Sequence, residues 1–107
     1  MMKIRFLLEY KCFPVWLYDE NDNLIDTKLP KELEPETAIE KELIEISDAY
    51  DELFIDNETE FRYIGFKDID MKDHFFQKTS KIIETIKALI GEEYNIVDDI
   101  NTRKADF

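Results

Sequence analysis

The sequence predicts an α+β fold: an antiparallel sheet of four or five strands with two helices packed on one face. Short segments with apolar residues at every second position indicate strands, and two longer segments with apolar residues at every third or fourth position indicate helices. The elements follow the order β-β-β-α-β-α, with a further short strand after the second helix. The chain has no internal repeat or linker-like run, so residues 1–107 are expected to form a single domain.

Three strands are expected near the N-terminus. In residues 4–10 and 13–18, apolar side chains recur at every second position. This is the pattern of a strand with one buried face, because successive side chains point to opposite faces of a strand. The polar run 19–23 between strands predicts a turn, because Asn and Asp tolerate left-handed backbone conformations. A third short strand is expected at Leu24 and Ile25. Because both helices are expected on the same face of the sheet, the other face has no covering helix.

The first helix is predicted over residues 36–54. Pro35 suits its start because the first turn leaves that backbone N–H without a partner in any case. Its apolar side chains recur at helical spacing and form a narrow stripe. The stripe consists of Ile39, Leu43, Ile46, Tyr50 and Leu53.

The second half of the chain predicts a strand over 61–66 and a helix that Asp70 caps and that ends at Ile90. Gly91 then stands where a left-handed helix cap is expected. The apolar arc of this helix is broad enough to lie across a sheet, and comprises Phe75, Phe76, Thr79, Ile82, Ile83, Ile86, Leu89 and Ile90. Residues 94–97 are expected to form a last short strand, and residues 98–107 are expected to form a flexible tail.

The negative charge is concentrated in one part of the sequence. The formal net charge is −12, from 14 basic and 26 acidic residues. Residues 31–60 hold twelve acids and two bases, which is a net charge of −10, whereas 1–30 and 61–107 each carry −1. Most of the charge therefore belongs to the first predicted helix and its flanks.

At 100° per residue, the acidic side chains of this helix lie mainly opposite its apolar stripe. We call this surface the acidic helix face and predict that it binds a partner. Like-charged neighbours on it cost about 0.2–0.5 kcal/mol per pair, which a helix selected only for stability would avoid. A purely solubilising role is the alternative. The acidic helix face consists of Glu40, Ile44, Glu45, Asp48, Asp51 and Glu52, with Ile44 as an apolar anchor.

Several function classes are excluded or disfavoured. The excess of acids excludes nonspecific binding of nucleic acid or of anionic membranes, since both need an excess of cations. One Cys and one His cannot form a Cys/His zinc site or an internal disulfide. The run 19–23 fails as a calcium loop because Leu24 stands where Gly is required. We therefore expect no enzymatic activity, no cofactor and no metal, and the absence of a signal sequence or membrane span predicts a cytoplasmic protein.

In overall character the chain resembles the small acidic bacterial immunity proteins that bind toxins, notably nucleases with basic active sites. The segments Val15–Glu20 and Leu53–Asn57 also resemble fixed elements of a small bacterial family. The resemblance implies an inhibitor that performs no reaction and that neutralises a basic protein partner through the acidic helix face.

Two other functions remain open from the sequence. A DNA mimic would use the same carboxylates to block a nucleic-acid-binding protein. A structural or regulatory homodimer would instead use the uncovered sheet face, for which Trp16, Tyr18 and Leu7 are the candidate residues. Competition with duplex DNA would indicate the first of these, and a salt-insensitive dimer would indicate the second.

Overall fold

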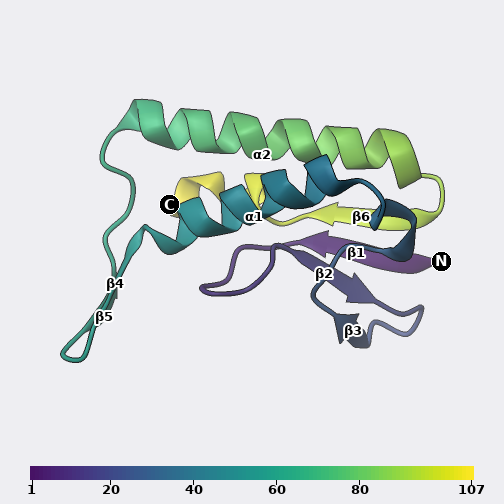
Figure 1. The fold of residues 1–107 in the computed structure, drawn as a ribbon, viewed down its shortest axis with the longest axis horizontal. Coiled ribbons are helices and arrows are strands. Elements are labelled where there is room, and N and C mark those ends of the chain that lie inside the picture. The colour runs from purple at the N-terminus through teal and green to yellow at the C-terminus, as the bar shows by residue number, and fades with distance from the viewer.

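Four strands form the main sheet, in the spatial order β3-β2-β1-β6 (Figure 1). The central strand β1 (Met2–Phe6) pairs antiparallel with β2 (Val15–Tyr18) and parallel with β6 (Tyr94–Asp98). β3 (Leu24–Asp26) forms the edge beside β2. This computed structural model describes residues 1–107 and confirms the α+β class.

One pairing differs from the wholly antiparallel sheet that the sequence predicts. Strand β6 follows the long helix α2 (Ile69–Ile90), which lies beside the sheet and returns the chain to the central strand (Figure 1). A connection of this length allows the chain to re-enter the sheet in the parallel sense, which a hairpin cannot do. The sheet is therefore mixed, with β1 and β6 as its parallel pair.

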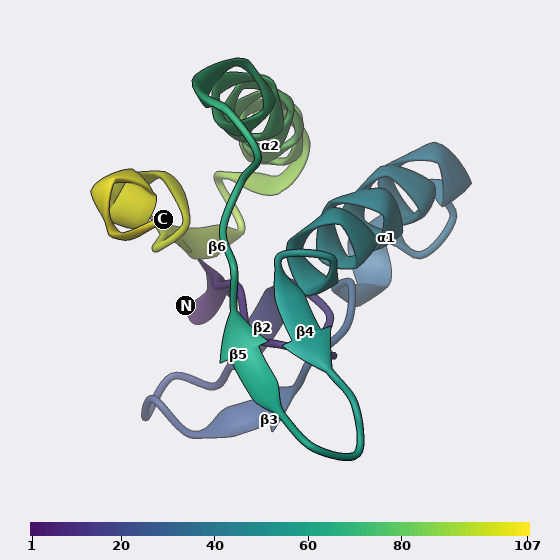
Figure 2. The ribbon, with the colours of Figure 1, turned by 90° about the vertical axis from the view of Figure 1, so that its left-hand side faces the viewer.

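Both helices lie on the same side of the main sheet, as predicted (Figures 1 and 2). The first, α1 (Thr37–Asp51), follows a short 3₁₀ helix, η1 (Lys31–Leu33), and runs in the opposite direction to α2 (Figure 1). The expected apolar stripe of α1 is buried throughout. In α2 the predicted arc is also buried, except that Leu89 is exposed.

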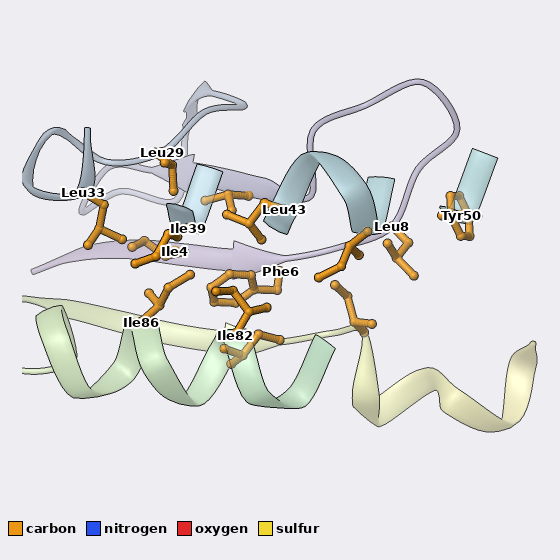
Figure 3. Packing of buried hydrophobic residues seen from close by; sticks show 14 of the residues in the cluster. Ile4, Phe6, Leu8, Leu29, Leu33, Ile39, Leu43, Tyr50, Ile82 and Ile86 are labelled. Atoms are coloured by element: carbon orange, nitrogen blue, oxygen red, sulfur yellow. The ribbon is translucent and has the colours of Figure 1, made fainter. Parts of the chain in front are cut away.

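The core lies between the sheet and the two helices. Ile4 and Phe6 of β1 are fully buried, and their alternating neighbours Lys3 and Arg5 lie on the opposite sheet face. Figure 3 shows the two apolar residues of β1 among side chains from both helices, including Leu43 of α1. This single cluster fixes the orientation of α1, and therefore determines which of its faces points outward.

A two-stranded hairpin separates the helices, and the sequence predicts only half of it. The first predicted helix ends at Asp51 rather than at residue 54, because Phe54 begins strand β4 (Phe54–Asp56). The ring of Phe54 stacks on that of Phe61 in β5 (Phe61–Tyr63), with centroids 5.4 Å apart. Strand β5 stops short of residue 66, because Gly65 adopts a positive φ of 75° that turns the chain toward α2.

The ends of α2 also differ from the prediction. Asp68, not Asp70, is the N-cap, and its side chain accepts a hydrogen bond of 2.8 Å from the backbone N–H of Met71. Both aspartates suit a helix start by sequence, but only Asp68 has the extended backbone of a cap. At the other end, Gly91 has right-handed rather than left-handed backbone angles, since the chain continues through a tight turn into β6.

Removal of this cap should destabilise the protein measurably. We expect Asp68→Ala to lower the free energy of unfolding by about 1 kcal/mol, because the N–H of Met71 loses its acceptor. Asp68→Asn is the matched control and should retain most of the stability, since its amide oxygen can accept the same bond. Urea denaturation followed by circular dichroism provides the measurement. Equal stability of the two variants would contradict the assignment of the cap.

The C-terminal residues, for which the sequence predicts a flexible tail, include a 3₁₀ helix, η2 (Asn101–Asp106). Ile100 is buried in the core cluster, and Phe107 packs against the cluster. Asp98 accepts hydrogen bonds from the backbone N–H groups of Ile100 and Asn101, at 3.0 and 2.9 Å. In this structure residues 98–107 therefore complete one end of the core.

Candidate partner-binding surface

The predicted acidic helix face lies on the side of α1 that points away from the core. Four of its five carboxylates are exposed, and Asp51 is half-buried. Ile44 is exposed over 44% of its surface, which is unusual for an isoleucine on a helix whose other face is fully packed. Burial of the apolar stripe thus places all six residues at or near the surface.

The carboxylates of this face differ in what they contact. Glu45 forms an ion pair of 2.8 Å with Lys78 of α2. Asp51 accepts a hydrogen bond of 2.9 Å from the backbone N–H of Lys11, in the loop between β1 and β2. Glu40, Asp48 and Glu52 form no ion pair with the protein's own cations. Three of the five carboxylates therefore remain available to an external cation.

The position of these acids within α1 is unfavourable for the helix itself. The C-terminal turn of α1 contains Asp48 and Asp51, Glu52 is its C-cap, and no basic residue lies there. The C-terminus is the negative end of the helix dipole, where each carboxylate costs about 0.3–1 kcal/mol at the surface. The helix would be more stable with neutral or basic residues at these positions, so its own stability does not account for the acids.

The ion pair with Lys78 makes a testable contribution to stability. It lowers the pKa of Glu45 below its ordinary value of 4.5, chiefly through the hydrogen bond from the ammonium group. The stabilisation is therefore present above about pH 4.5 and is lost as the pH falls through the lowered folded-state pKa.

We expect Glu45→Gln to unfold at a slightly lower temperature than the unmodified protein at pH 7, and at the same temperature near pH 2. Calorimetry at the two pH values provides the measurement. Glu42→Gln, on the same helix and without an ion pair, should show no such pH-dependent difference. A difference for Glu45→Gln that persists in acid would contradict the ion pair as its cause.

The second predicted surface lies on the opposite side of the sheet. Trp16 and Tyr18 are half-buried on the face of β2 that the helices do not cover, next to Arg5 and Lys3 of β1. The ammonium of Lys3 lies 4.8 Å from the ring centroid of Tyr18. Leu7 is not part of this surface, because it is buried beyond the end of β1. Cationic and aromatic side chains thus share this face, which differs in character from the acidic helix face.

The structure also contains a groove that the sequence does not predict. The C-terminal half of α1 and the N-terminal half of α2 enclose a cavity of about 470 Å³. Its apolar lining consists of Ile46, Ala49, Met71 and Phe75, and its polar lining of Glu45, Asp68, Asp70, His74 and Lys78. The sequence contains one indication of this groove. Met71, Phe75 and Lys78 are spaced four and three residues apart, which places them along one side of α2.

No three potential metal ligands among the His, Cys, Asp and Glu side chains come together in the structure. None of its helices is both long enough and apolar enough to cross a membrane. Among the carboxylates of the acidic helix face, Glu40, Asp48 and Glu52 are exposed on the same helix as the exposed side chain of Ile44.

A family model described as Serratia CdiI immunity protein-like matches residues 2–98, which span both helices and all six strands. A comparison with curated proteins finds no match.

Proposed function

This chain belongs to the Serratia CdiI immunity protein-like family, and we propose that it neutralises its toxin by binding it through the acidic helix face. Membership of the family implies an immunity protein whose partner is a contact-dependent inhibition toxin. Our proposal adds the surface used and the chemistry of the partner. In it the protein performs no reaction and acts in the cytoplasm.

The concentration of charge is the observation that carries this proposal. Residues 31–60 hold −10 of the net charge of −12, and three carboxylates of the acidic helix face have no internal cation. A surface of this kind attracts a basic partner over a distance and raises the rate of association. A nuclease toxin fits this description, because its substrate is a polyanion and its active site must be basic.

The exposed side chain of Ile44 supports the same surface. It lies on α1 among the carboxylates, so the face combines an apolar centre with a charged surround. Interfaces commonly have this arrangement, in which an apolar anchor contributes affinity and the surrounding charges contribute specificity and speed. We therefore place Ile44 in contact with the toxin.

The proposal is tested with the cognate contact-dependent inhibition toxin domain, which is to be sought first in the gene immediately upstream. Cells that express the toxin domain should grow only when they also produce the immunity protein. Purified together, the two proteins should form a complex whose association rate falls steeply as the salt concentration rises. A failure to restore growth, or an association rate that does not depend on salt, would refute the proposed mode of action.

A matched experiment separates this function from DNA mimicry. An immunity protein binds one cognate target, whereas a DNA mimic binds several proteins that recognise duplex DNA. Helix α1 has 15 residues and is about 22 Å long, so it can imitate only a short stretch of phosphates. We expect no binding to unrelated basic DNA-binding proteins at physiological salt.

A further inference from the structure

The groove between α1 and α2 has the chemistry of a site for a single cationic side chain. We propose that it receives one arginine of the toxin, with the aliphatic stem on the apolar floor and the guanidinium among the carboxylates. This inference rests on the proposed function and specifies a second contact beside the acidic helix face. The two surfaces share Glu45, which belongs to α1 and also lines the groove.

The floor of the groove suits the aliphatic part of such a side chain. Ala49 is half-buried beside the buried residues Ile46 and Phe75. Met71 lies on the α2 side and is exposed over 45% of its surface, an unusual position for a flexible apolar side chain. Arginine buries its methylene groups along surfaces of this kind while its charged end stays near water.

The polar lining favours a cation. Three carboxylates, one histidine (His74) and one lysine line the groove, and the lysine, Lys78, is already paired with Glu45. Asp68 and Asp70, by contrast, form no ion pair with the protein's own cations. The ion pair between Lys78 and Glu45 also shows that an ammonium group is accommodated at the side of the groove.

The helix dipoles do not reverse this preference. The two helices run antiparallel, so the negative C-terminal end of α1 lies beside the positive N-terminal end of α2 (Figure 1). These partial charges oppose one another, and the side chains decide the sign of the potential. We favour arginine over lysine because its planar guanidinium can bind two carboxylate oxygens at once.

Occupation of the groove by an internal cation tests the proposal. Met71→Arg places a guanidinium at the groove, where it should compete with the toxin. The matched control is Ile69→Arg, because Ile69 lies in the same turn of α2, is exposed over 67% of its surface and does not line the groove. We expect Met71→Arg to bind the toxin domain at least tenfold more weakly than Ile69→Arg, with unchanged unfolding temperatures.

A small probe tests the groove without the toxin. We expect n-butylguanidinium at millimolar concentrations to shift the NMR signals of the Met71 and Ala49 methyl groups, and n-butanol to shift them much less. Asp70→Asn should weaken the effect of the cation, whereas Glu84→Gln, elsewhere on α2, should not. The absence of a charge-dependent shift would overturn the proposal.

The outcomes distinguish this inference from the function on which it rests. If the unmodified protein does not bind the toxin domain, the proposed function fails and the inference fails with it. If the unmodified protein binds and the two arginine variants bind equally well, only the groove proposal is wrong. The groove proposal would be supported if Met71→Arg weakened toxin binding and Ile69→Arg did not, and if the NMR shifts of the methyl groups depended on the charge of the probe.

Discussion

Reversal of two charges at the end of α1 should weaken toxin binding about a hundredfold, because each close charge pair across an interface contributes about 1.5 kcal/mol or more. The variant is Asp48→Lys with Glu52→Lys. Both carboxylates are exposed and form no ion pair within the protein, so little internal structure depends on them. We expect most of the loss to appear in the association rate, which surface plasmon resonance at several salt concentrations measures directly.

The same variant should be more stable than the unmodified protein. Lysines at the C-terminal end of a helix interact favourably with its dipole, and the repulsion among neighbouring acids is relieved. The unfolding temperature should therefore rise while the affinity falls, a combination that partial unfolding cannot produce. Asp51 is left unchanged because it accepts the hydrogen bond from Lys11.

The control for this experiment reverses two acids elsewhere. Glu84→Lys with Glu92→Lys changes the net charge by the same amount, in α2 and in the turn that follows it. This control should reduce binding only by the weaker long-range effect of net charge. Equal losses for the two double variants would mean that the acidic helix face is not the contact surface.

Truncation of Phe6 should have the largest effect on stability. Phe6 lies on the central strand, is exposed over only 1% of its surface and is among the largest fully buried side chains. Phe6→Ala should lower the free energy of unfolding by about 3–5 kcal/mol, from lost burial and from the cavity that remains. This is a large fraction of the total stability of about 5–15 kcal/mol that a domain usually has.

Phe61→Ala is the matched control for this substitution. Phe61 is exposed over 57% of its surface and stacks only within the aromatic group around the β4–β5 hairpin. Loss of its ring contacts should cost about 0.5–1.5 kcal/mol. Guanidinium chloride denaturation measures both values, and similar losses for the two variants would contradict the assignment of the core.

The parts of the fold that the sequence predicts correctly depend on short-range periodicity. The stripe of α1 and most of the arc of α2 are buried as expected, because a helix presents residues three and four apart on one face whatever it packs against. The parallel pairing of β6 and the strand at Phe54 depend on contacts between distant residues. The Phe54 ring, for example, packs against Tyr10 as well as Phe61.

By itself, the sequence determines that negative charge is concentrated on one helix and that this helix has one apolar face. These properties follow from residue order and helical geometry alone. Only the tertiary structure decides which carboxylates are used internally, since Lys78 and the backbone of Lys11 reach α1 from other elements. It alone also creates the groove, because two helices that are separate in the sequence must pack side by side before their side chains can enclose a shared space.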